Sequence, residues 1–293
     1  MTLRHLKVFV AVCENGSVTK AADALHMVQP AVSTTIAELE KYYKASLFDR
    51  INQRLVITEL GKELLVKAKS ILAQFEDFEE TAMLGGQNPK LRIGSSLTLG
   101  KTILPSLLTR IKEKLPQLEP TFIIDKTAVI EAKLECGELD FGIVEGDIHS
   151  EHLKKRPLGE DRLIAVCSPD YSAPSKISLG EAIRYPLLLR ECGSASRDLF
   201  DGVLAQKHFA VRPFVESVSN EALIAFAASG HGIAVLPEGI VGEAISQGIL
   251  KSLTIADASM TRTHYLLIHK NKRFNTLCQC SCTVKKQATE NNR

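Results

Sequence analysis

Residues 18–40 read VTKAADALHMVQPAVSTTIAELE, and residues 47–61 read LFDRINQRLVITELG. The first stretch has the pattern of an alanine-rich helix, a turn at residues 26–28, and a second helix that begins at Gln29-Pro30. Proline suits that first turn because its missing N–H has no helical partner there. The second stretch has the pattern of a short hairpin. Together they predict a winged helix-turn-helix, a module that places one helix in the major groove of DNA.

The second helix has one apolar face and one face of small and hydroxyl-bearing residues. Val32, Ile36 and Leu39 recur at helical spacing, so we expect that face to be buried. The opposite face could simply be solvated, but the neighbouring turn and hairpin favour contact with DNA. Arginines that flank the hairpin tip could reach phosphate or a minor groove. The expected DNA-binding residues are Gln29, Pro30, Ser33, Thr34, Ala37, Arg50 and Arg54.

A long helix is expected from Thr58, its cap, to about Met83. Apolar residues follow a 4-3-4-3 spacing, which is the seam of a coiled coil. The helix could instead pack on its own domain, but a narrow sustained seam favours pairing with a second chain. The expected dimerisation residues are Leu64, Ala68, Ile71, Phe75 and Phe78. Gly85-Gly86 and Asn88-Pro89 should then end the helix in a hinge.

Beyond residue 89, strand-like apolar runs alternate with helical segments, a pattern typical of an α/β fold. Strands are expected at LRIGSS, TFIID, LDFGIVEG, RLIAVCSP, PLLLREC, VRPFVESV, GIAVLP and HYLLIHK. We expect an all-α winged helix-turn-helix at 1–58, a linker helix and hinge at 59–88, and a two-subdomain α/β domain at 89–293. The subdomains would be about 89–162 plus 265–293, and 163–264.

Bulk properties narrow the class of protein. The 293 residues carry a net charge of +2, so any affinity for DNA must come from where the cations lie. The N-terminus lacks a signal-peptide pattern and no apolar run is long enough to span a bilayer, so we expect a cytoplasmic protein with no membrane partner. The seven cysteines should then be thiols. The C-x-C-x-C run at Cys278, Cys280 and Cys282 is a weak metal signal, and we expect neither a metal nor a cofactor.

These features together resemble the LysR-type transcriptional regulators over nearly the whole chain. The N-terminal likeness is carried by Ala21-Ala22, Leu25-His26, Gln29-Pro30-Ala31-Val32-Ser33, Leu39-Glu40, Leu47-Phe48, Arg50, Arg54, Thr58-Glu59 and Gly61. Looser matches are residues 137–143 and 228–237. The resemblance implies paired linker helices, in a homodimer or homotetramer, and an effector domain like periplasmic binding proteins. It also implies double-stranded DNA with an interrupted inverted repeat as partner.

Two departures from the family pattern concern the recognition helix. Val28 stands where the family often has a serine that can cap this helix. Thr34 and Thr35 stand where a basic or long polar pair is common, which leaves fewer guanine-reading contacts. The base preferences of other members therefore do not carry over.

Serine and threonine gather where strands meet helices in the C-terminal region. Helix N-termini with hydroxyls beside them can bind anions, although each hydroxyl could merely cap its helix. The resemblance places the loop after the first strand and the GSAS segment at the effector cleft. We therefore expect a small anion or carboxylate as effector, with Arg197 in a structural ion pair as an alternative to binding. The expected effector-binding residues are Ser95, Ser96, Thr98, Thr127, Gly193, Ser194, Ser196 and Asn220.

Catalysis has little support in the sequence. No nucleophile elbow, H-E-x-x-H motif or P-loop occurs, so no catalytic residue is expected. The expected function is a DNA-binding transcriptional regulator whose promoter binding responds to a small effector. Two alternatives remain: an enzyme fused to a regulatory helix-turn-helix, and a ligand-binding protein with a vestigial DNA module.

Overall fold

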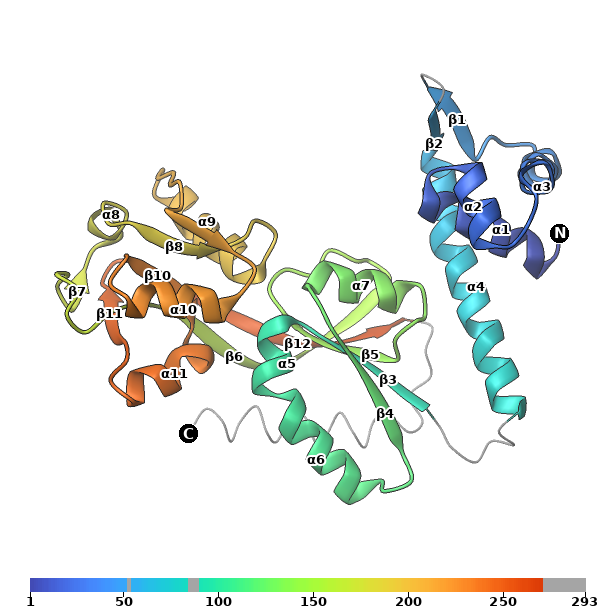
Figure 1. The fold of residues 1–293 in the computed structure, drawn as a ribbon. Helices are drawn as coiled ribbons and strands as arrows, with labels where there is room; N and C mark the ends of the chain where they lie inside the picture. The colour runs from blue at the N-terminus through green and yellow to red at the C-terminus, as the bar shows by residue number, and fades with distance from the viewer. Residues whose placement is uncertain (52–53, 84–89, 271–293) are drawn as a thin grey trace. The chain divides into compact units, whose positions relative to one another are not determined.

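The computed structural model describes residues 1–51, 54–83 and 90–270. The chain folds into two compact units, Met1–Pro89 with Lys133–Leu139, and Lys90–Ala132 with Asp140–Arg293. Figure 1 labels the helices and strands in chain order. The expected hinge at Gly85-Gly86 and Asn88-Pro89 and the cysteines Cys278, Cys280 and Cys282 lie outside the described residues.

Three helices form the core of the N-terminal unit: α1 (Leu3–Asn15), α2 (Val18–Ala24) and α3 (Gln29–Tyr43). Ala21 and Ala22 are almost fully buried, since their small side chains let the helices approach closely. Ser17 caps α2 by accepting a hydrogen bond from the backbone N–H of Lys20. Val28 makes no side-chain cap on α3, and Pro30 lies in its first turn. The apolar residues of α3 that face this core are Val32, Ile36 and Leu39.

The wing is the antiparallel pair β1 (Phe48–Ile51) and β2 (Arg54–Ile57). Glu40 fixes its base, because one carboxylate oxygen accepts hydrogen bonds from the backbone N–H groups of Leu47 (2.7 Å) and Phe48 (3.2 Å). Thr58 follows the wing, and its hydroxyl accepts from the N–H of Gly61 at 3.0 Å, as expected of a cap. The long helix α4 (Glu59–Met83) then begins.

The apolar seam of α4 divides into two parts. Ala68 is buried in the N-terminal core and Leu64 packs against it, so this part of the seam contacts its own domain. Further along, the side chains of Ile71 and Phe78 are 45% and 68% exposed. The rings of Phe75 and Phe78 stack with centroids 6.5 Å apart. An apolar surface made of Ile71, Phe75 and Phe78 thus remains accessible.

The second unit begins with a parallel arrangement that we call the first lobe. Its strands are β3 (Lys90–Ser95), β4 (Glu119–Ile124) and β5 (Phe141–Glu145), with β3 in the centre. Its helices are α5 (Leu97–Thr102), α6 (Leu104–Lys114) and α7 (Thr127–Glu135). The segment after β3 forms two helices rather than one, because Ile103 ends α5 and Pro105 lies in the first turn of α6.

Two hinge strands connect the first lobe to a second one. They are β6 (Leu153–Cys167) and β12 (Thr261–His269), which pair antiparallel, and β12 also pairs with β5. In the second lobe, β10 (Ile233–Pro237) pairs antiparallel with β6. Strand β8 (Leu187–Arg190) pairs parallel with β10, and β9 (Val215–Ser217) pairs parallel with β8. Strands β7 (Lys176–Ile177) and β11 (Lys251–Ile255) complete it, with helices α8 (Leu179–Ala182), α9 (Ala195–Gln206), α10 (Asn220–Ala228) and α11 (Glu238–Ser246).

Apolar clusters in each lobe fix the positions of these strand ends. Ile93, Leu107 and Ile143 are almost fully buried in the first lobe, as are Leu189 and Phe200 in the second. Parallel strands place their carboxyl ends at one edge of the sheet, where ligands of open α/β folds bind.

In the described residues, no helix is long and apolar enough to cross a membrane.

Candidate functional site

Polar segments from the carboxyl ends of β3, β4, β5 and β8 meet at a small cavity of about 20 Å³. The cavity is small, so without rearrangement it suits only a compact chemical group. The residues lining it are Ser96, Leu97, Thr98, Lys126, Thr127, Glu145, Arg190, Gly193, Ser194, Ala195 and Ser196.

Most of the expected effector-binding residues line this cavity, but two of them do not. Ser95 is fully buried, and its hydroxyl donates to the carbonyl of Ile143 at 3.1 Å. The amide oxygen of Asn220 accepts from the guanidinium of Arg190 at 3.0 Å, so Asn220 positions a cavity residue. Both residues therefore lie next to the cavity lining without being part of it. The expected residues that line the cavity are Ser96, Thr98, Thr127, Gly193, Ser194 and Ser196.

The helix-capping alternative is also correct for several of these hydroxyls. Ser96 and Ser194 accept hydrogen bonds from the backbone of α5 and α9, respectively. Since α5 has only six residues, its dipole contributes little at Ser96. Gly193 precedes the α9 cap with φ +77°, a left-handed conformation that glycine adopts without strain. Arg197 makes structural ion pairs with Asp201 and Glu216, as the alternative interpretation held.

Charged side chains that the sequence did not single out surround these hydroxyls. Arg190 is 3% exposed, and its Nε donates to Glu191 at 2.9 Å. Lys126 Nζ lies 3.2 Å from the same carboxylate and bridges the two lobes. Burial alone would raise the pKa of Glu191, but hydrogen bonds from Arg190 and the proximity of Lys126 lower it. Two cations therefore share one ionised carboxylate at the cavity wall.

A second charged group joins the cavity to the hinge strands. Arg262, on β12, donates to Asp161 on β6 through Nε (2.6 Å) and Nη2 (2.7 Å). Its Nη1 lies 3.4 Å from Glu145 and 3.1 Å from the hydroxyl of Ser196. Burial by itself would raise the pKa of Asp161, but the hydrogen bonds from Arg262 lower it to about 2. One guanidinium thus links both lobes, the hinge and the cavity wall.

A wider cavity of about 540 Å³ continues from the small one. The two share Thr127, Glu145, Gly193 and Ala195. Carboxylates of Glu131, Asp147 and Asp198 and the side chain of Tyr265 also line it. A ligand held in the small cavity could therefore extend a larger group into this space.

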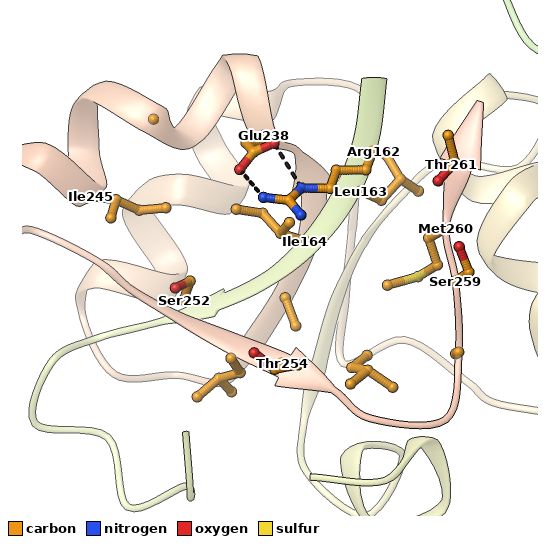
Figure 2. Close-up of a pocket in the computed structure, with 15 residues that line it drawn as sticks. Arg162, Leu163, Ile164, Glu238, Ile245, Ser252, Thr254, Ser259, Met260 and Thr261 are labelled. Atoms are coloured by element: carbon orange, nitrogen blue, oxygen red, sulfur yellow. Dashed lines mark hydrogen bonds and ion pairs between the residues drawn. The ribbon is translucent and has the colours of Figure 1, made fainter. Parts of the chain in front are cut away.

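A separate cavity of about 500 Å³ lies in the second lobe, between α11, β6 and the segment from β11 to β12 (Figure 2). Arg162 and Glu238 pair at its side through hydrogen bonds of 2.8 and 2.6 Å (Figure 2). Both side chains are well exposed, and they already neutralise each other. The expected effector-binding residues do not line this cavity, which leaves the first site as the stronger candidate.

The sequence contains a partial signal for the charged residues around the small cavity that were not among the expected effector-binding residues. Glu145 and Arg190 are charged residues at the carboxyl ends of fully apolar strand runs, a pattern that could have identified them. Lys126 directly precedes the expected Thr127. Arg262 lies inside a strand far from these segments, and its local sequence gives no indication that it reaches Ser196.

The expected DNA-binding surface lies on α3. Gln29, Pro30, Thr34 and Ala37 are exposed, and Ser33 is half-buried, while the opposite face of the helix packs into the core. Backbones of Arg50 and Arg54 lie in the wing strands, but their side chains are outside the described part of the chain. The exposed face of α3 therefore carries the small side chains of Pro30, Thr34 and Ala37.

Family models match both units of the chain. The model described as the bacterial regulatory helix-turn-helix protein of the lysR family matches residues 3–62, and the LysR substrate binding domain matches residues 84–280. The HTH-type transcriptional regulator YeiE of Escherichia coli K12 is 30% identical over 277 residues, 94% of each chain.

Solved structures show the same fold. HinK, a LysR family transcriptional regulator from Pseudomonas aeruginosa, matches with a TM-score of 0.61 at 22% identity, over 98% of both chains. The regulatory domain of CcmR from Synechocystis, in complex with 2-PG, matches with a TM-score of 0.62 at 23% identity, over 69% of this chain and 98% of that one. These structures confirm the expected fold class, and the family models together with YeiE confirm the expected class of transcriptional regulator. This chain belongs to the LysR family of DNA-binding transcriptional regulators with an effector-binding domain.

Proposed function

We propose that a small anionic effector binds in the cavity between the two lobes and changes how a pair of chains holds DNA. The observation that carries this proposal is the convergence of six expected residues on one cavity. The nearby Lys126, Arg190 and Arg262 add hydrogen-bond donors with positive charge. The Synechocystis CcmR domain is solved in complex with 2-PG, which supports a small effector for this fold.

A ligand panel on the full-length protein tests the effector class. Inorganic phosphate, sulfate, short carboxylates, an aromatic compound and an amine would be compared by thermal shift, because a ligand that binds the folded state raises the unfolding midpoint. Ser194→Ala should remove the shift produced by an anion. Ser178→Ala is the matched control, since Ser178 also caps a helix but does not line the cavity. Stabilisation by the aromatic or the amine alone would contradict the proposal.

We further propose that two chains pair through the exposed apolar surface of α4 and bind an interrupted inverted repeat in the cytoplasm, where the DNA lies. Ile71, Phe75 and Phe78 would otherwise leave an apolar stripe in water. The proposed domain limits are 1–58, 59–88 and 89–293, which keep α4 between the DNA-binding and effector domains.

Roles within the DNA-binding surface can be separated by two variants. Thr34→Ala should relax base preference at one position by about 1–3 kcal/mol if Thr34 contacts a base. Arg54→Ala should weaken binding to all sequences and reduce its salt dependence if Arg54 contacts phosphate. Thr35→Ala is the control, because that hydroxyl donates to the carbonyl of Ala31 at 2.9 Å within the helix. Footprinting of the DNA upstream of the gene would locate the site, and equal effects of all three variants would contradict these roles.

A further inference from the structure

The carboxylate of Glu145 is an unusual component of an anion-binding cavity. It lines both the small cavity and the wider one, and the residue is 3% exposed. The hydroxyl of Thr127 donates to its backbone carbonyl at 3.0 Å, which fixes the end of β5. The hydroxyl of Ser96 donates to Oε2 of Glu145, and Nη1 of Arg262 lies 3.4 Å from Oε1 of the same carboxylate. Glu145 is therefore held in place as a hydrogen-bond acceptor that faces the ligand space.

The charges around the small cavity are balanced in the described part of the chain. Lys126 and Arg190 share Glu191. Arg262 lies between Asp161 and Glu145. Lys126, Arg190 and Glu145 line the small cavity, and with Glu191, Arg262 and Asp161 behind them the cluster has three cations and three carboxylates. Recognition must come from individual hydrogen bonds, and a bare anionic oxygen next to Glu145 would be repelled.

We propose that Glu145 selects an oxyanion that still carries a proton, and that this proton is donated to the Glu145 carboxylate. The inference rests on the anion site proposed above and narrows its ligand class to protonated tetrahedral oxyanions such as hydrogenphosphate. Thr98, Ser194, Ser196 and Lys126 line the same cavity and have donors for the remaining oxygens. A fully deprotonated oxyanion of the same size, such as sulfate, has no hydrogen for Glu145 and brings two like charges together in a poorly solvated place.

Two pairs of inorganic ions test this selectivity by isothermal titration of the full-length protein at pH 8. Phosphate and sulfate are there mainly dianions of similar size, and they differ by the proton; arsenate and selenate form a second such pair. A site that hydrogen-bonds a ligand hydroxyl discriminates strongly against the analogue that lacks it. We expect phosphate and arsenate to bind at least about a hundredfold more tightly than sulfate and selenate.

The variant Glu145→Gln should remove this selectivity. An amide can donate a hydrogen to sulfate, so we expect its affinity for sulfate to rise at least about tenfold and the ratio between the ions to fall by a similar factor. Glu238→Gln is the matched control, since it makes the same change in an ion pair outside this cavity. Circular dichroism would verify that each variant is folded, and the ion ratio of the unmodified protein tests the proposal without any variant.

The possible results separate the two proposals. Equal binding of phosphate and sulfate to the unmodified protein would overturn the role of Glu145 and leave the anion site intact. Tighter binding of sulfate than of phosphate would do the same. Binding of no oxyanion to either the unmodified protein or Glu145→Gln would overturn the anion site and this inference with it.

Discussion

Replacing Arg262 by methionine tests how much its ion pairs stabilise the two hinge strands, β6 and β12. The guanidinium is 3% exposed at its side chain and makes two short hydrogen bonds to Asp161. Methionine retains much of the length but none of the charge, so Glu145 would lose its cation and Asp161 would keep only the imidazole of His264, 3.3 Å away. Breaking a buried ion pair from one side typically costs about 3–5 kcal/mol, because the remaining charge is uncompensated. We expect a loss in this range for Arg262→Met.

A matched variant lies in the neighbouring hinge strand. Arg162 also makes two hydrogen bonds to one carboxylate, that of Glu238, but its side chain is 63% exposed. Solvent screens such a pair, so Arg162→Met should cost only about 0–1 kcal/mol. Urea unfolding of the full-length protein, followed by circular dichroism, would give both differences from the shift in midpoint and the slope.

A double variant identifies the physical cause. If the cost of Arg262→Met comes from a stranded carboxylate, adding Asp161→Asn should recover part of the lost stability, and the two changes should be less than additive. Similar losses from Arg262→Met and Arg162→Met, or strict additivity with Asp161→Asn, would refute the reasoning.

Three further predictions concern the close packing at Gly61, the pH dependence of the Asp161 ion pair and the exposed surface of α4. Gly61→Ala should destabilise the N-terminal unit by about 1–3 kcal/mol in calorimetry, because a Cβ there would lie 2.5 Å from the Leu47 carbonyl oxygen; an unchanged transition would contradict this close packing. The pKa of Asp161 is lowered from 3.8 to about 2, so its ion pair should stabilise the fold above about pH 4 and lose this contribution as the pH falls through about 2. The free energy of unfolding lost in this way is on the order of 2 kcal/mol. Asp161→Asn should therefore lose less stability to urea in acid than the unmodified protein does. Phe78→Glu should give monomers in sedimentation at micromolar concentration while Lys62→Glu does not, because only the first places a charge on the exposed apolar surface of α4; a Phe78→Glu dimer would show that the interface lies elsewhere.

The N-terminal unit was predictable because its interactions are local. The spacing of Val32, Ile36 and Leu39 determines which face of α3 is buried, and Pro30 marks where the helix begins. Alternation of apolar runs with helical segments likewise predicted the α/β class of the second unit. Helix α11 and strand β11 were not expected as separate elements, because their short apolar patterns do not distinguish a strand from a helix.

The α4 seam shows where periodicity alone is insufficient. The residues Leu64, Ala68, Ile71, Phe75 and Phe78 share one stripe of the helix, but only the tertiary structure shows that the first two pack on their own domain. A helical period specifies a face and says nothing of which partner covers each turn.

By itself, the sequence determined the two architectures and the hydroxyls at strand ends, since these depend on residues close together in the chain. Only the tertiary structure decided which of those hydroxyls meet in one cavity, and it moved Ser95 and Asn220 into supporting positions. It alone brought Arg262 next to Ser196 and Glu145, residues 66 and 117 positions away. The physical reason is that pairing of β12 with β5 and β6 creates these contacts, and the pairing of distant strands depends on the packing of the whole domain.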